Sequence, residues 1–177
     1  MNIELAQIIE IVATMVLSAF FSGMEIAFVS SNRMLAEMDK DKNRNDISQI
    51  LISYFYRHPN GFVSTMLVGN NIVLVMYGIL FANIFDNTLF ADFDAGARVT
   101  LDTIFSTIVI LFTGEFLPKV LFKASPNRLL TLFAPLAAVF YVLLWPVSKF
   151  ASFLSRLMLR IGGTRINVVS EEEGFTK

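Results

Sequence analysis

The sequence predicts an all-α membrane protein with three transmembrane helices, juxtamembrane belt helices, and a proline-kinked helix or hairpin in the inner leaflet. Hydrophobic residues make up 55% of the 177 residues and the mean hydropathy is +0.62, well above the values of a soluble domain. Four apolar runs are each long enough to cross a bilayer core, which takes about 20 helical residues. Positive charges gather on one side of the first three runs, which orients them.

Composition excludes several classes of function. Charged residues amount to 16% and the net charge is -1, so no nucleic-acid partner is expected. The chain has no cysteine and one histidine, which excludes disulfide frameworks, thiolate metal sites and cysteine nucleophiles. No serine–histidine or paired-aspartate arrangement spans the apolar runs, so we do not expect an enzyme. Any metal chemistry must use oxygen ligands.

The three predicted spans are residues 3–29, 62–85 and 99–122. The first run is interpreted as a retained span and not as a signal peptide. Glu4 and Glu10 stand where a signal peptide carries positive charge, and the apolar stretch exceeds the usual 7 to 15 residues. The lipid bilayer is therefore the first partner of this chain.

The segment 30–61 is predicted to form one or two juxtamembrane helices, because apolar residues such as Ile47, Leu51 and Tyr54 recur at helical spacing. His58 to Gly61 read His-Pro-Asn-Gly and predict a turn before the second span. Four aspartates are interpreted as a solvated external loop: Asp86, Asp92, Asp94 and Asp102.

Charge sets the predicted orientation. Five positive residues lie between the first and second spans, whereas Arg98 is the only one between the second and third. The first loop is then cytoplasmic, because positive residues stay inside. We expect a multi-pass protein of the cell membrane with its N-terminus outside and its C-terminus in the cytoplasm.

The fourth apolar run falls in the second juxtamembrane segment, 129–161. Crossing would carry Arg156 and Arg160 to the outer face, against the charge rule. Pro135 and Pro146 each remove a backbone donor within the run. We interpret it as an inner-leaflet helix or hairpin, with a fourth span as the open alternative.

Polar residues beside glycines interrupt each of the three spans, at 20–25, 68–71 and 113–119. At 1.5 Å rise per residue, Ser22, Asn70 and Glu115 all lie about 11 to 12 Å from the cytoplasmic ends of their helices. Three antiparallel helices would therefore bring a hydroxyl, an amide and a carboxylate to one level.

These groups are hard oxygen ligands of the kind that Mg²⁺, Ca²⁺ or Na⁺ binds. Pro118 has no N–H for the carbonyl of Gly114, which leaves that oxygen without its helical donor. We predict a cation site formed by Ser22, Asn70 or Asn71, Glu115 and the Gly114 carbonyl.

Each residue also has a simpler structural interpretation. Glu115 can pair with Lys119, one turn away, or Lys119 can reach the cytoplasmic surface and leave Glu115 to the site. Ser22 and the asparagines can serve helix packing alone. Glu25 is either a charge at the mouth of the site or a helix-end surface charge. The periphery of the predicted site comprises Gly23, Glu25, Gly69, Pro118 and Lys119.

Three motifs resemble the transmembrane domain of the CNNM/CorC family of magnesium transporters. They are Phe-Phe-Ser-Gly-Met-Glu-Ile-Ala-Phe-Val-Ser at 20–30, Leu-Val-Gly-Asn-Asn at 67–71 and Gly-Glu-Phe-Leu-Pro-Lys at 114–119. The resemblance implies a homodimer with three transmembrane helices and a belt of juxtamembrane helices in each subunit. It also implies a dehydrated Mg²⁺ between the three motifs and export of Mg²⁺ in exchange for Na⁺.

Carried over to this sequence, the metal-binding residues of the family fall on Ser22, Asn70 and Glu115. The family commonly has a second asparagine one turn after the first, and this chain has Leu74 there. Asn71 lies about 100° away around an ideal helix.

Family members continue into a cytosolic pair of CBS modules. We expect residues 1–161 to be the ion-transport domain and 162–177 a linker toward such modules, which this chain does not include. A Mg²⁺-sensing regulatory protein that modulates another transporter is the alternative function, and ion flux separates the two.

Overall fold

The computed structural model describes residues 3–34, 46–85 and 94–161. Every regular element in this part is helical, so the all-α prediction is confirmed for it. The elements are α1 (Ile3–Ser30), α3 (Ile47–Arg57), α4 (Pro59–Phe85), α5 (Ala95–Ile110), the π-helix η1 (Leu111–Phe116), α6 (Leu117–Ala124) and α7 (Pro126–Ile161).

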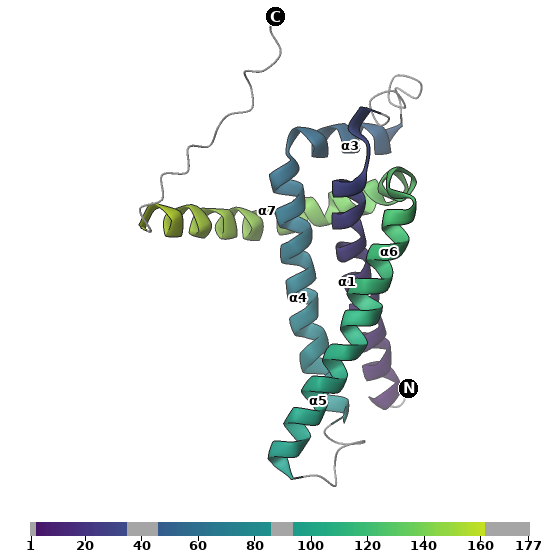
Figure 1. The fold of residues 1–177 in the computed structure, drawn as a ribbon, viewed down its shortest axis with the longest axis vertical. Helices are drawn as coiled ribbons and strands as arrows, with labels where there is room; N and C mark the ends of the chain where they lie inside the picture. The colour runs from purple at the N-terminus through teal and green to yellow at the C-terminus, as the bar shows by residue number, and fades with distance from the viewer. Residues whose placement is uncertain (1–2, 35–45, 86–93, 162–177) are drawn as a thin grey trace, which may run out of the picture.

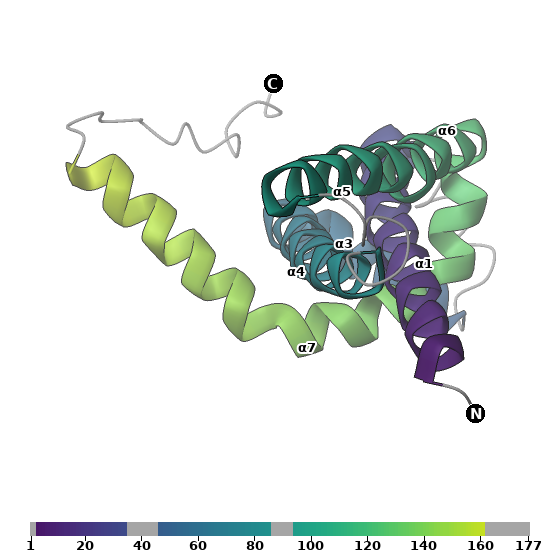
Figure 2. The same ribbon diagram turned by 90° about the horizontal axis from the view of Figure 1, so that it is seen from below.

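The helices run in two directions. In Figure 1, α1, α4 and the continuous run of α5, η1 and α6 extend along the long axis, whereas α3 lies across one end and α7 runs across the bundle near that end. Seen from below, α7 curves around one side of the other helices (Figure 2). The first helix contacts α4, η1, α6 and α7, so α1 is the centre of the bundle.

Within the described ranges, four helices are long and apolar enough to cross a membrane: Leu5–Ser30, Pro59–Ile84, Ala95–Ala124 and Pro126–Val147. The chain is therefore a multi-pass membrane protein. The first three helices agree with the three predicted spans to within four residues at each end. The fourth is the run for which crossing was the open alternative.

The predicted turn from His58 to Gly61 is wrong in its length, because the connection in the structure is shorter. Asp46 caps the start of α3 by accepting a hydrogen bond from the Ser48 N–H at 2.9 Å, and His58 ends that helix. Pro59 then starts α4 at once, because proline at the first helical position loses no hydrogen bond. One residue, and not four, joins the two helices.

The hairpin alternative for the last apolar run is also wrong. Pro135 and Pro146 both lie inside α7, which is a continuous helix of 36 residues. Each proline removes one N–H donor but leaves the hydrogen bonds of the neighbouring turns intact. A long helix can therefore continue through the proline with a bend, whereas a short one would end there. Both prolines are exposed, and their rings displace no packed side chain of this chain.

The external-loop interpretation fails for one of its four aspartates. Asp94 is exposed at the start of α5, as a loop-end residue should be. Asp102, however, lies within α5 with only 8% of its surface exposed. Asp86 and Asp92 lie outside the described residues, as does the predicted linker 162–177.

Aromatic rings form the main core between α1 and α7. Phe20 packs edge-on against Phe133, with ring centroids 6.0 Å apart, and Phe21 packs against Phe140 at 4.9 Å. Phe21 and its neighbour Met24 are 2% and 0% exposed. This core holds the polar face of α1 in place next to α4 and η1.

Candidate metal centre

A buried polar face runs along α1. Thr14, Ser18 and Ser22 follow one another at four-residue intervals, so they share one side of the helix, and all are at least 96% buried. Thr14 donates to the carbonyl of Ile11 at 2.7 Å. Ser22 is completely buried, and its Oγ has no hydrogen-bond partner among the described residues.

The two asparagines of α4 lie in different surroundings. Asn70 is 7% exposed, and its Oδ1 accepts a hydrogen bond of 2.8 Å from Ser18 Oγ. Asn71 is exposed, as its position about 100° further around the helix predicts. Of the two, only Asn70 faces the interior of the bundle.

The third motif folds into the π-helix η1. The Leu117 N–H donates to the carbonyl of Phe112, five residues back, and Pro118 has no N–H. The carbonyls of Thr113 and Gly114 therefore both lose the donors that an α-helix would give them. The sequence predicted this loss for Gly114 but not for Thr113, because a π-turn leaves no sign in the residue pattern.

Gly114 lies directly against the Ser18–Asn70 pair. A Cβ atom at Gly114 would lie 3.2 Å from Ser18 Oγ and 2.7 Å from Ile110 Cδ1, so no larger residue fits without displacement. One point between α1, α4 and η1 thus holds a hydroxyl, an amide oxygen and a main chain in which two carbonyls have lost their α-helical donors. Single π-turns within α-helices occur frequently at functional sites.

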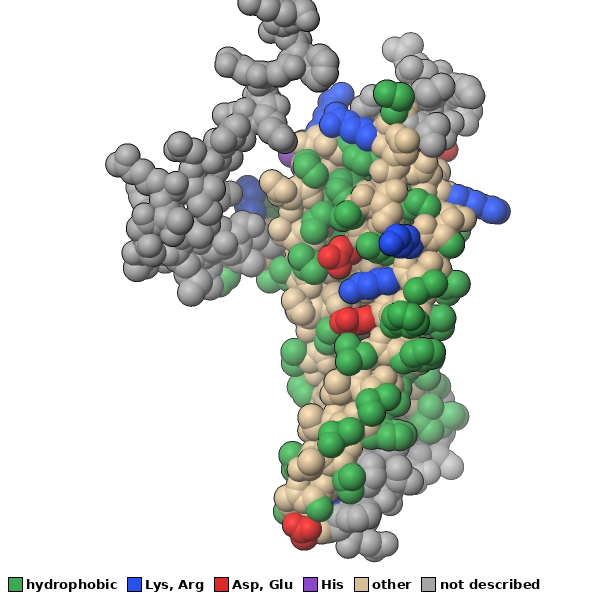
Figure 3. Space-filling model, in the orientation of Figure 1, with side chains coloured by type: hydrophobic (Ala, Val, Ile, Leu, Met, Phe, Trp, Pro, Cys, Tyr) green, Lys and Arg blue, Asp and Glu red, His purple; other side chains and the backbone are tan. Residues whose placement is uncertain are grey.

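Glu115 forms the local ion pair that its sequence spacing allows. Lys119 Nζ lies 3.9 Å from Glu115 Oε2, and the two side chains are 43% and 26% exposed. Among the described residues, Glu25 has no such partner and is half-buried. Figure 3 shows acidic and basic side chains close together on this side of the molecule, above a broad hydrophobic surface.

Gly23 and Gly69 allow close helix contacts. A Cβ at Gly23 would lie 2.6 Å from the ring of Phe122 in α6, and one at Gly69 would lie 2.6 Å from the ring of Phe21 in α1. Each glycine makes room for a phenylalanine of a neighbouring helix. The two contacts fix α1 against α6 on one side of Ser22 and against α4 on the other.

The helices are offset by one turn from the predicted level. We expected Ser22 to lie opposite Asn70, but the structure pairs Asn70 with Ser18, about 6 Å earlier along α1. Ser18 is the residue that the sequence reasoning missed. The available signal was its position one turn before Ser22, on the same side of the helix.

The groups that meet at this centre are mostly uncharged. No group of three or more His, Cys, Asp or Glu side chains suited to a metal occurs among the described residues. Leu74, which replaces the second family asparagine, packs against Tyr77, Phe81 and Ile110 and contributes no oxygen. A cation at this point would meet hydroxyl, amide and carbonyl oxygens, whereas the Glu115 carboxylate is paired with Lys119.

Comparison with known proteins places the chain in a family. Residues 8–174 match the family model described as "CNNM: Cyclin M transmembrane N-terminal domain". The UPF0053 inner membrane protein YfjD of Escherichia coli (strain K12) is 29% identical over 154 residues, which cover 86% of this chain and 34% of that protein. The UPF0053 protein MG146 of Mycoplasma genitalium is 28% identical over 150 residues, covering 81% of this chain and 35% of the relative.

This chain thus spans about a third of the length of these curated relatives. The family match covers all three polar motifs and the whole of the described helical bundle except the start of α1. The chain therefore belongs to the CNNM family, as its cyclin M transmembrane N-terminal domain.

Proposed function

We propose that this chain is the membrane domain of a Mg²⁺ transporter that exports Mg²⁺ in exchange for Na⁺. The observation that carries the proposal is the fully buried hydroxyl of Ser22, which has no hydrogen-bond partner among the described residues and lies one turn after Ser18, the residue that contacts Asn70 and Gly114. Unsatisfied polar groups are costly in a membrane interior. A bound cation satisfies several at once.

The proposed ligands come from three helices. Ser22 supplies a hydroxyl, Asn70 the remaining lone pair of its Oδ1, Glu115 a carboxylate, and Gly114 its main-chain carbonyl. Mg²⁺ prefers six oxygens at about 2.1 Å and keeps water where protein ligands are missing. Ser18 holds the Asn70 amide in orientation through its 2.8 Å hydrogen bond.

The Glu115–Lys119 pair supplies the charge balance. Without a cation, Lys119 neutralises the carboxylate across 3.9 Å. When Mg²⁺ enters, Glu115 turns toward it and Lys119 extends to the membrane surface, as long basic side chains do near helix ends. Loss of the cation reverses both movements, so the pair links ion release to a rearrangement of α6.

We further propose that α1, α4 and the run of α5, η1 and α6 are the three spans, and that α7 lies in the plane of the inner leaflet. Its direction across the bundle supports this placement (Figure 1), as does the excess of positive charge in its later half. The N-terminus is then outside and the C-terminus in the cytoplasm. The functional unit is a homodimer, with CBS modules following in the cytoplasm.

Mg²⁺ flux in proteoliposomes tests the function. Purified protein reconstituted around a Mg²⁺ indicator should move Mg²⁺ down its gradient, faster when Na⁺ is present on the opposite side. Empty liposomes provide the baseline. Calorimetric Mg²⁺ binding without any flux would reject the transporter and assign the sensor function.

Two neighbouring asparagines provide the matched variants. Asn70→Ala should weaken Mg²⁺ binding about tenfold or more, because it removes a ligand to a charged ion. Asn71→Ala should change the affinity by less than about twofold. Glu115→Gln should abolish binding, since it removes the only carboxylate. Wild-type affinity in Asn70→Ala or Glu115→Gln would reject this ligand set.

A further inference from the structure

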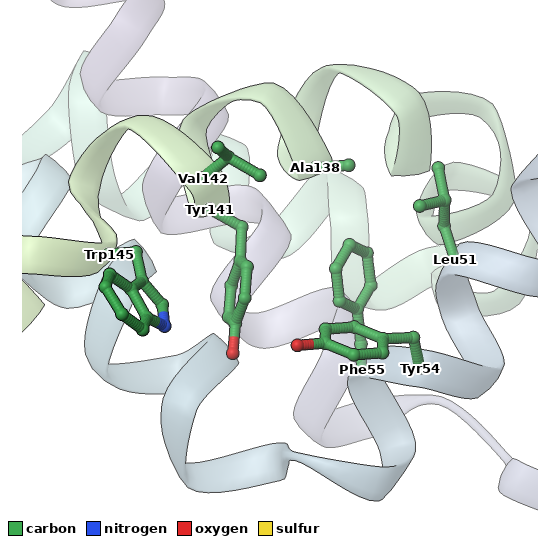
Figure 4. A pocket seen from close by; sticks show the side chains of 7 residues that line it. All are labelled: Leu51, Tyr54, Phe55, Ala138, Tyr141, Val142 and Trp145. Atoms are coloured by element: carbon green, nitrogen blue, oxygen red, sulfur yellow. The ribbon is translucent and has the colours of Figure 1, made fainter. Parts of the chain in front are cut away.

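A pocket of about 320 Å³ lies between α3 and α7, away from the metal centre. Figure 4 shows its seven lining residues, which are Leu51, Tyr54 and Phe55 of α3 and Ala138, Tyr141, Val142 and Trp145 of α7. Its volume falls in the range of small-molecule sites, and such sites are mostly apolar with a few placed polar groups. The pocket has both properties.

The polar atoms of the pocket lie on one side. In Figure 4, the hydroxyl groups of Tyr54 and Tyr141 point toward one another, and the ring nitrogen of Trp145 lies near the same edge. Phe55 and Tyr141 are buried, whereas Trp145 is 48% exposed. The pocket thus has an apolar interior and a rim with hydrogen-bonding groups, which matches an amphiphilic ligand.

Basic side chains flank this rim. Lys149 Nζ lies 3.9 Å from the centre of the Trp145 ring. The ring of His58 packs on that of Tyr54, with centroids 4.6 Å apart. Arg57, beside His58, is exposed. None of the seven lining residues is acidic, so the rim favours an anionic head group.

We propose that this pocket binds an anionic phospholipid of the surrounding bilayer. An acyl chain fills the apolar interior, and the phosphate lies at the rim near Lys149 and the tyrosine hydroxyls. Basic pockets on the cytoplasmic side of membrane proteins bind anionic head groups, and tyrosine and tryptophan favour the level of the head groups. The proposal rests on the proposed placement of α3 and α7 at the cytoplasmic end of the bundle, and it is independent of ion transport.

The single tryptophan of the chain is a built-in reporter, because Trp145 lines the pocket. The protein is placed in nanodiscs of phosphatidylcholine that contain increasing fractions of brominated phosphatidylglycerol or, separately, of brominated phosphatidylcholine. The anionic lipid should quench Trp145 fluorescence with saturation and about fivefold better than the neutral lipid. Equal quenching by both lipids would overturn the proposal, since it indicates ordinary boundary lipid.

Two variants separate charge from volume. Lys149→Gln should bring the two lipids to about equal quenching. Ala138→Phe should fill the pocket and remove the saturable component, whereas Val139→Phe, at a neighbouring position that is 61% exposed and outside the pocket, should keep it. Preference retained in Lys149→Gln would overturn the proposal.

Soluble glycerol phosphate distinguishes the source of the phosphate. It should leave the quenching unchanged, because it has no chain to occupy the apolar interior. Relief of quenching would assign the rim to a free phosphate compound and overturn the lipid. Mg²⁺ binding measured on Lys149→Gln should stay at the wild-type level, which separates failure of this proposal from failure of the transport function.

Discussion

The hydroxyl of Ser22 imposes a cost that no other described residue offsets. A buried polar group without a partner costs about 1 to 3 kcal/mol, and Ser22 is 0% exposed. An alanine there would remove the cost, and Ala27 on the same helix shows that small apolar residues fit this core. The proposed cation would remove this cost by binding the hydroxyl.

Substitution of Leu74 tests whether one more side-chain oxygen completes the proposed ligand set. It lies one turn after Asn70, on the same side of α4, with its side chain against Ile110. Leu74→Asn should raise Mg²⁺ affinity by about 1 kcal/mol, or roughly fivefold, because an amide already in place replaces a retained water. Calorimetry on purified protein measures the change.

Leu74→Ala provides the control, since it shortens the side chain without adding an oxygen. It should leave Mg²⁺ affinity unchanged. Unchanged or weaker binding in Leu74→Asn would mean that a main-chain oxygen or water already holds that coordination position firmly. The family's second asparagine would then have no counterpart here.

Sequence reasoning found most of the residues of the centre but not their pairing. Ser22, Asn70 and Gly114 each stand out because polar residues and glycines interrupt apolar helices. Ser18 does not, because a lone serine in such a helix reads as packing. Its contact with Asn70 depends on the offset of α1 and α4, which the aromatic core sets through contacts such as Phe21 with Gly69.

At the scale of elements, η1 is the feature that the sequence specifies only in part. Pro118 in the sequence predicts a lost hydrogen bond. The wider π-turn, which holds one more residue than an α-turn, follows from how the run from α5 to α6 packs on α1. Similarly, Pro135 and Pro146 predict bends without deciding between a hairpin and a long helix. The continuous α7 keeps the hydrogen bonds of the turns between its prolines, which a hairpin would sacrifice.

Substitution by alanine should change the stability of the protein in opposite directions at two glycines of α4. Gly69→Ala would place a Cβ 2.6 Å from the buried ring of Phe21 and should destabilise the protein by about 1 to 3 kcal/mol. Gly78→Ala meets nothing within 4 Å and should stabilise it by up to about 1 kcal/mol, because alanine favours a helix over glycine. Thermal unfolding in detergent measures both changes.

Equal effects at the two positions would contradict this reading of the α1–α4 contact. Destabilisation at Gly78 alone would show that this face of α4 packs against a second subunit, since no described residue of its own chain lies within 4 Å of a Cβ there. Size-exclusion chromatography of the same variants identifies that outcome. These measurements thus distinguish the packing of Gly69 within one chain from packing of α4 between subunits.

At the scale of the whole molecule, length and charge give conflicting indications. By length and apolar composition, α7 qualifies as a fourth span, yet crossing would carry the positive residues of its later half to the outer side. The direction of α7 across the other helices (Figure 1) supports the proposed placement in the inner leaflet, in which those charges stay inside. A helix lying in the interface keeps its apolar side in lipid and its basic side chains in water, so the proposed three-span arrangement would satisfy both constraints.

Cysteine labelling tests this arrangement directly, because the chain has no cysteine of its own. Ser125→Cys marks the end of α6, Lys149→Cys marks the later half of α7, and Gly96→Cys marks the start of α5; all three positions are exposed. If α7 lies in the plane of the inner leaflet, an impermeant maleimide should label the first two from the cytoplasmic side and Gly96→Cys from outside. If α7 crosses, Lys149→Cys should instead react together with Gly96→Cys. Because Ser125→Cys and Gly96→Cys report the two ends of the same span, opposite labelling of this pair validates the assay, and the side of Lys149→Cys then decides between three spans and four.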